Sequence, residues 1–81
     1  MVRVSVKTDV EQRLLKLGAA VRAQRLGLGL SQEALADASG IDRSHMSQIE
    51  LGKRNVSILN VLRIADAMNL RAGDLITAAG L

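Results

Sequence analysis

Apolar residues recur in this chain at intervals of three and four, and this spacing restricts the fold more than any other feature. Leu14, Leu17 and Val21 follow the interval in the first third of the sequence. Side chains spaced in this way lie on one face of an α-helix. The sequence also contains no Pro, a residue that breaks helices. We therefore expect an all-α protein. The same interval returns later, at Ile58, Val61, Leu62, Ala65 and Met68.

Glycines and capping residues divide this pattern into five predicted helices. Gly27 and Gly29 are expected to end the first helix, because Gly is the usual residue at a helix C-terminus. Thr8 or Asp9 is its expected N-cap, and residues 2–7 are expected to form an arm or a short extended piece. The other predicted helices cover residues 32–39, 43–51, 58–68 and 72–79, with Ser31, Asp42 and Ser57 as N-caps and Arg71 before the last.

Composition narrows the classes of function. The chain has 81 residues, the size of one small domain. It has no Cys, which excludes disulfides and thiolate metal sites, and no aromatic residue on which single-stranded bases could stack. The net charge of +3 is compatible with a polyanionic partner, but the placement of the charges must carry that argument. Without a signal peptide or a membrane-spanning stretch, we expect a cytoplasmic protein with no membrane partner.

The segment from Gln32 to Leu51 is the most informative about function. Two short helices joined by a tight turn at Gly40 have the form of a helix-turn-helix. The second of them is expected to turn hydrogen-bonding side chains outward, and a helix of this size fits a DNA major groove about 12 Å wide. These outward residues are Arg43, Ser44, Ser47 and Gln48, and the expected inner residues are Leu35, Ala36, Ile41, Met46 and Ile49.

The stretch GLSQEALADASGIDRSHMSQIELGKRNVSILNVLRIADAMNL resembles the phage-repressor/Cro-like (XRE-type) helix-turn-helix family. The resemblance covers about Leu17 to Leu75. It implies a five-helix, lambda-repressor-like DNA-binding domain over residues 17–81, with residues 1–16 as an N-terminal arm or the start of the first helix. Within the family, ELGKRN (residues 50–55) and DRSHMS (residues 42–47) are similar to the controller proteins of restriction–modification systems.

The resemblance also implies roles for individual residues. The outward residues Arg43, Ser44, Ser47 and Gln48 would read base edges, a role for which Arg suits guanine and Gln suits adenine. Arg25 and Glu50 would form a structural ion pair. Leu51 stands where the family often has a polar or basic residue. Contacts with DNA phosphates are implied for Ser31, Gln32, His45, Lys53, Arg54 and Asn55, of which His45 could instead touch a base.

The expected partners follow from this reading. One helix-turn-helix chain makes too few contacts with DNA for tight specific binding. A homodimer on an inverted repeat of double-stranded DNA is therefore predicted. Its interface should lie on the last two helices, with Leu70, Leu75 and Ile76 as the candidate apolar contacts. RNA polymerase is a further candidate partner. No cofactor and no enzymatic activity are expected.

Other interpretations stand beside this one. Arg43 could be an ordinary solvated residue, and Lys53 and Arg54 could be charges favoured by the helix dipole. A metal site is disfavoured, since His45 is the single His and there is no Cys. The chain could also be an antitoxin-type protein-interaction module whose DNA binding is secondary. An exposed apolar surface on the first 16 residues would favour that alternative.

Overall fold

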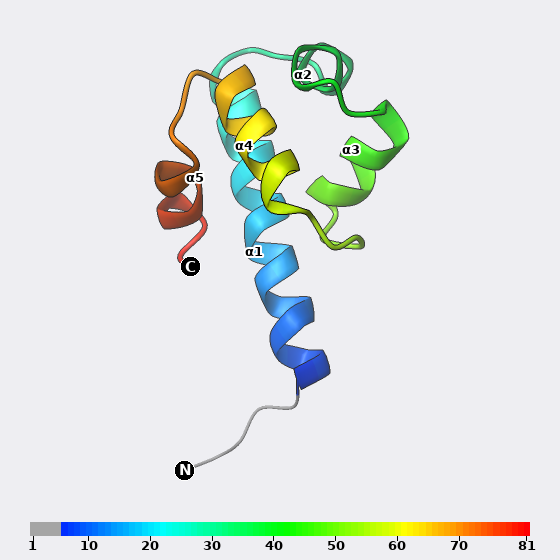
Figure 1. The fold of residues 1–81 in the computed structure, drawn as a ribbon, viewed down its shortest axis with the longest axis vertical. Helices are drawn as coiled ribbons and strands as arrows, with labels where there is room; N and C mark the ends of the chain where they lie inside the picture. Colours follow the sequence, from blue (N-terminus) through cyan, green and yellow to red (C-terminus); the bar gives the residue numbers. More distant parts are fainter. Residues whose placement is uncertain (1–5) are drawn as a thin grey trace.

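The computed structural model describes residues 6–81, and in this range it contains five α-helices and no strand (Figure 1). The helices are α1 (Val6–Gly27), α2 (Gln32–Ser39), α3 (Arg43–Glu50), α4 (Ile58–Ala67) and α5 (Ala72–Ala78). The all-α prediction is confirmed. Helix α1 runs along the length of the molecule, and the shorter helices pack around its C-terminal half (Figure 1).

The start of α1 differs from the prediction. The helix begins at Val6, so Thr8 and Asp9, the expected caps, lie inside it. Asp9 is in the first turn, where a carboxylate is favoured by the helix dipole, and it pairs with Arg13 one turn later at 3.1 Å. These local interactions suit a helix that starts before Asp9. The remainder of the predicted arm, residues 2–5, lies outside the described residues.

The N-terminal caps of the next three helices are confirmed. The hydroxyl of Ser31 accepts a hydrogen bond from the amide of Ala34 at 3.0 Å, and Ser57 does the same for Asn60 at 3.1 Å. Asp42 caps α3. Such caps satisfy amides that have no partner within the helix. Arg71 precedes α5 and makes no side-chain cap hydrogen bond.

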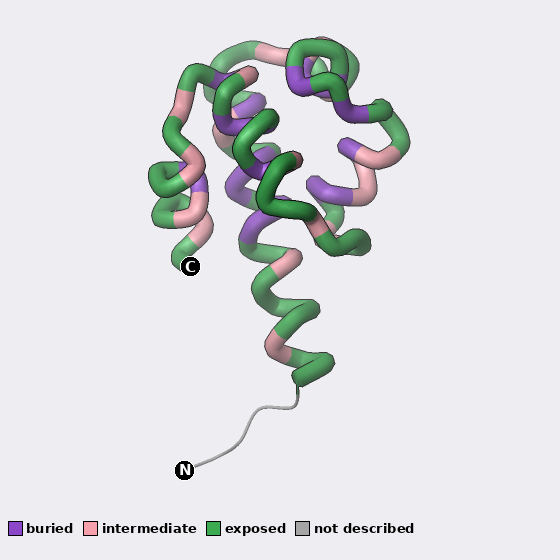
Figure 2. Tube along the Cα trace, in the orientation of Figure 1, coloured by how far each residue is buried: buried purple, intermediate pink, exposed green. Residues whose placement is uncertain are grey.

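One hydrophobic core joins the five helices, and Figure 2 shows where buried positions lie along the chain. Leu35 of α2, Met46 of α3, Ile64 of α4 and Leu75 of α5 are fully buried within it. The other buried apolar residues are Leu17, Ala20, Val21, Ala36, Ile41, Ile49, Val61, Ala65 and Met68. The inner positions predicted for the helix-turn-helix are therefore confirmed.

The predicted inner face of α4 is partly wrong. Val61, Ala65 and Met68 are buried, but Ile58 and Leu62 are 67% and 41% exposed. The face that packs also contains Ile64, so it is rotated around the helix from the predicted one. Both faces obey an interval of three and four, and only tertiary packing decides between them.

Candidate nucleic-acid interface

Helix α3 is held at its start by Asp42. The Asp42 carboxylate accepts hydrogen bonds from the backbone amide of Ser44, at 3.2 Å, and from the Ser44 hydroxyl. The hydrogen bond from Ser44 lowers the pKa of Asp42, so the cap is ionised at neutral pH. The Ser44 hydroxyl thus donates within the protein and keeps its acceptor lone pairs for an outside group.

The four residues predicted to read bases share the outward side of α3. Arg43 and Ser44 are exposed, and Ser47 and Gln48 are partly exposed. Residues at these positions are neighbours on a helix, because three or four residues make one turn. Met46 and Ile49 point the other way, into the core. The structure therefore presents a polar helix face on a helix anchored by its apolar side.

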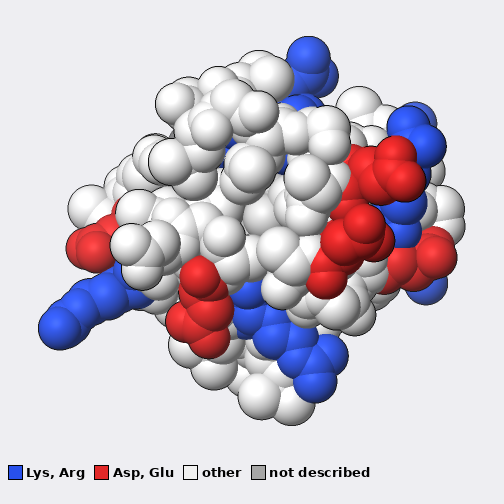
Figure 3. Space-filling view, turned by 90° about the horizontal axis from the view of Figure 1, so that it is seen from above, with Lys and Arg blue, Asp and Glu red and all other residues white. Residues whose placement is uncertain are grey.

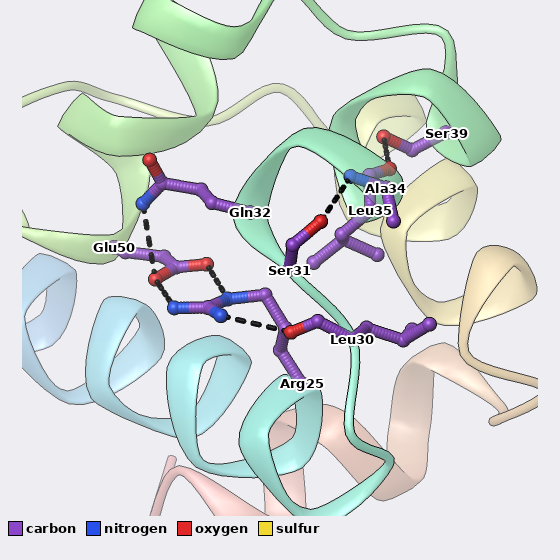
Figure 4. Close-up of polar contacts among 8 residues, drawn as sticks. All are labelled: Arg25, Leu30, Ser31, Gln32, Ala34, Leu35, Ser39 and Glu50. Carbon is purple, nitrogen blue, oxygen red and sulfur yellow. Dashed lines mark hydrogen bonds and ion pairs between the residues drawn. The ribbon is translucent and has the colours of Figure 1, made fainter.

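The expected ion pair between Arg25 and Glu50 is present and buried (Figure 4). Arg25 Nε lies 2.8 Å from Glu50 Oε2, and Arg25 Nη2 lies 2.9 Å from Oε1, a two-point arrangement. The side chains are only 10% and 3% exposed. The hydrogen bonds to Glu50 raise the pKa of Arg25, which stays charged. The pair fixes the end of α3 to α1.

Gln32 and Leu30 extend this ion pair into a network that also holds the start of α2 (Figure 4). Gln32 Nε2 donates to Glu50 Oε1 at 3.3 Å, and Arg25 Nη1 donates to the carbonyl of Leu30 at 3.0 Å. Among the described residues, no buried side-chain nitrogen or oxygen lacks a hydrogen-bond partner. Gln32, predicted to bind a phosphate, is thus oriented by Glu50 and has one amide hydrogen left to donate.

Gly18 is a structural residue of the site that the sequence pattern did not predict. A Cβ at this position would lie 2.3 Å from the carbonyl oxygen of Ile49 and 2.6 Å from that of Glu50. The backbones of α1 and α3 therefore approach so closely that no larger residue fits. The available signal was a Gly inside a helical pattern, which costs helix stability and usually has a packing reason.

The loop after α3 is basic and exposed. Lys53, Arg54 and Asn55 are all accessible, and residues 51–57 include no acidic residue. The loop turns at Gly52, whose φ is +70° and which lies against the backbone of Leu15 in α1. Leu51, where the family often has a polar residue, is 46% exposed. Positive side chains thus follow directly after the polar face of α3.

At the end of the molecule where α2 lies, positively and negatively charged side chains are mixed. Seen from the end at which α2 lies, acidic and basic side chains stand next to one another around an uncharged centre (Figure 3). The positive charge on this face is therefore interrupted by acidic side chains. The described residues also contain no group of three or more side chains suited to a metal ion, and no helix among them is long and apolar enough to cross a membrane.

The fold and this polar, anchored helix define a helix-turn-helix protein. A family model described as "Helix-turn-helix" matches residues 21–75, most of the chain. The chain therefore belongs to the helix-turn-helix family, and the resemblance noted in the sequence is confirmed.

Its relatives include proteins named as controllers. The chain is 38% identical over 61 residues to the control protein C.SmaI of Serratia marcescens, covering 75% of this chain and 73% of that one. It is 40% identical over 63 residues to the control protein C.BamHI of Bacillus amyloliquefaciens, covering 76% and 78%. The crystal structure of the restriction-modification controller protein C.AhdI from Aeromonas hydrophila superposes with a TM-score of 0.75 at 45% identity, covering 76% of this chain and 94% of that one.

Proposed function

We propose that this protein is a transcription regulator that binds double-stranded DNA in a sequence-specific way, with α3 in the major groove. One observation carries the proposal: Arg43, Ser44, Ser47 and Gln48 share the outward face of a helix whose end is fixed by the buried Arg25–Glu50 pair. A rigid support matters because base reading depends on fixed hydrogen-bond geometry.

Phosphate contacts would orient α3 on the duplex. The candidate residues flank α3 in the sequence. Gln32 is at the start of α2, before α3, and Lys53, Arg54 and Asn55 are in the loop after it. Ser31 and His45 are further candidates, although the Ser31 hydroxyl already caps α2. Contacts of this kind set register and orientation while the α3 face reads sequence.

We further infer a homodimer on an inverted repeat, with half-site centres about 10–11 base pairs apart. The sequence predicts an interface on the last two helices. Leu75 has to be removed from that interface, because it is fully buried in the core of one chain. Leu70 and Ile76 are partly buried. The exposed apolar residues Ile58, Leu59 and Leu62 give α4 a better contact surface.

The names of the relatives support a role in controlling a restriction–modification operon. Covering a promoter would repress transcription, whereas touching RNA polymerase from a neighbouring site would activate it. We expect the protein to act in the cytoplasm without a cofactor or an enzymatic step, since DNA is the proposed ligand.

The test is selection of binding sites from random duplex DNA at near-physiological salt, followed by sequencing. We expect an inverted repeat with a defined half-site. The variant Arg43→Ala should lose preference at one base pair of each half-site, and Lys16→Ala, at an exposed basic residue of α1, is the control that should select the original motif. Recovery of unenriched sequences by the unaltered protein would refute the proposal.

A protein-interaction module of the antitoxin type is the second candidate function. Exposed apolar residues on the first part of α1 favour it: Val6, Val10 and Leu15 are 81%, 44% and 56% exposed. This alternative requires that a second small protein co-purifies with the chain from its native host and masks these residues. Purification of the chain alone, with full DNA binding, would exclude it.

A further inference from the structure

The start of α3 presents the hydroxyl of Ser44 in a single hydrogen-bonding role. The Ser44 hydroxyl is hydrogen-bonded to Asp42 Oδ2, and the same carboxylate oxygen accepts a hydrogen bond from the Ser44 amide at 3.2 Å. An ionised carboxylate only accepts hydrogen bonds, so the hydroxyl hydrogen of Ser44 points at Asp42. Both residues are exposed. Ser44 Oγ therefore offers only its lone pairs to a molecule that approaches α3.

The charge of Asp42 keeps the hydroxyl in this orientation. The hydrogen bond from Ser44 is the largest cause that lowers the pKa of Asp42, so the carboxylate is ionised at neutral pH. A hydrogen bond to an ionised acceptor is about twice as strong as one between neutral groups. Turning the hydroxyl toward a neutral base oxygen would therefore exchange a strong hydrogen bond for a weaker one.

The major-groove edges of the four bases fall into two classes beside such an oxygen. Adenine N6 and cytosine N4 carry amino hydrogens, whereas guanine O6 and N7 and thymine O4 only accept hydrogen bonds. An amino group would donate to Ser44 Oγ. A guanine or thymine oxygen in the same place would face another acceptor, with the negative charge of Asp42 behind it, and a desolvated acceptor without a donor is costly. The contact thus separates adenine and cytosine from guanine and thymine.

We propose that Asp42 is a positioning residue that makes Ser44 read a base with an exocyclic amino group, adenine or cytosine, at one position of each half-site. This inference rests on the proposed function, because it needs α3 in the major groove. It adds to that function a rule for one position of the operator. The preference over guanine and thymine should be about tenfold or more, the size expected for one hydrogen bond that involves a charged group.

The test is selection of binding sites from random duplex DNA by the unaltered protein, by Ser44→Ala and by Asp42→Gly. The position at which Ser44→Ala loses its preference identifies the base that Ser44 contacts. We expect adenine or cytosine there with the unaltered protein. Selection of guanine or thymine at that position would overturn the proposal.

Asp42→Gly tests the part played by the carboxylate. Gly is tolerated at an N-cap at little cost. Without the carboxylate the Ser44 hydroxyl can rotate and donate, so guanine and thymine should now be accepted at the identified position. The base pairs read by Arg43 and Gln48 are internal controls and should keep their preferences. Since removing a negative charge strengthens binding to all DNA, the relative preferences are compared. Continued exclusion of guanine and thymine by Asp42→Gly would overturn the role of Asp42.

A measurement without DNA tests the hydrogen bond itself. Titration of the Asp42 carboxyl by carbon NMR should show a higher pKa in Ser44→Ala than in the unaltered protein, because the hydrogen bond that lowers it is gone. Ser47→Ala removes the other hydroxyl of α3 and is the matched control, which should leave the pKa of Asp42 unchanged. An unchanged pKa in Ser44→Ala would show that the hydroxyl is not held by Asp42 and would overturn the proposal.

The selection experiment separates this inference from the proposed function. An inverted repeat with guanine or thymine at the position read by Ser44 would overturn the role of Asp42 and leave sequence-specific DNA binding standing. Failure of the unaltered protein to enrich any sequence would refute the proposed function, and this inference with it, whatever the titration shows.

Discussion

Arg25 and Glu50 are buried charged residues, and each compensates the charge of the other. Glu50→Ala would leave the Arg25 guanidinium buried without its partner and would remove the acceptor of Gln32. We expect a loss of about 3–5 kcal/mol in the free energy of unfolding, which is large for a small domain. Urea unfolding followed by far-ultraviolet circular dichroism measures it, since the chain has no aromatic fluorophore.

The matched control for this prediction removes both charges. Arg25→Leu combined with Glu50→Leu leaves no uncompensated ion, so its loss should be clearly smaller than that of Glu50→Ala. If the single and the double variants were equally unstable, the stability lost in Glu50→Ala would not come from the uncompensated charge of Arg25.

Arg43 and Arg54 have the same charge, but the structure assigns them to different surfaces. Arg43 is on the outward face of α3, and Arg54 is in the exposed loop that follows. Arg43→Ala should cost about 1–3 kcal/mol on the selected site and far less on unrelated DNA. Arg54→Ala should weaken all sequences alike and reduce the salt slope by roughly one per subunit. Titrations at several salt concentrations distinguish the two, and an equal loss on every sequence for Arg43→Ala would contradict its role.

The stability that the Asp42 cap contributes depends on pH, and the direction of the Asp42 pKa shift gives the sign of that dependence. Its hydrogen bond with Ser44 lowers the pKa of Asp42 below the ordinary value of 3.8. A carboxyl with a lowered pKa in the folded state contributes its full stability above the ordinary value, and the contribution disappears as the pH falls through the folded-state value.

Asp42→Asn keeps a good N-cap and removes this titration. We expect the unaltered protein to lose stability relative to Asp42→Asn as the pH falls below about 4. Urea midpoints at a series of pH values provide the measurement. A constant difference between the two proteins from pH 7 to pH 2 would show that the cap does not depend on the charge of Asp42.

At the scale of the elements, the packing of α3 on α1 depends on Gly18. Gly18→Ala raises helix propensity by about 1 kcal/mol, but its Cβ would overlap the carbonyl oxygens of Ile49 and Glu50. Because these are backbone atoms, α3 has to move. We expect a net destabilisation of about 1–3 kcal/mol and weaker DNA binding.

Gly73→Ala is the control for the same chemical change. Gly73 lies within α5, and a Cβ there would have no neighbour within 4 Å. That variant should be as stable as the unaltered protein or slightly more so. A stable Gly18→Ala variant with normal DNA binding would show that α3 can shift at no cost.

The elements also show which parts of the fold can be predicted from sequence. Ser31, Asp42 and Ser57 cap the helices that they were expected to cap, because a cap depends on residues within one turn. The buried face of α4 was misjudged, since two overlapping faces have the same spacing. The role of Gly18 was not predicted for a related reason: its contact with α3 exists only after the chain folds. The Arg25–Glu50 pair was available only through the family resemblance.

At the scale of the whole molecule, the proposed homodimer depends on the exposed apolar face of α4. Ile58, Leu59 and Leu62 are 67%, 61% and 41% exposed and are neighbours on the helix surface. Exposed apolar residues that adjoin one another mark contact sites more reliably than isolated ones. On a two-fold axis this face meets its own copy, so every substitution acts twice.

Leu59→Glu therefore tests the dimer. Each copy would lose about 1.5–3 kcal/mol of apolar burial, and the two glutamates would be brought close to each other. We expect sedimentation analysis to show monomers and operator binding to become much weaker, while circular dichroism stays unchanged because Leu59 is outside the core. Leu26→Glu, at another exposed leucine, should remain dimeric. A dimeric Leu59→Glu protein would move the interface away from α4 and toward the half-buried Leu70 and Ile76 of the C-terminal segment.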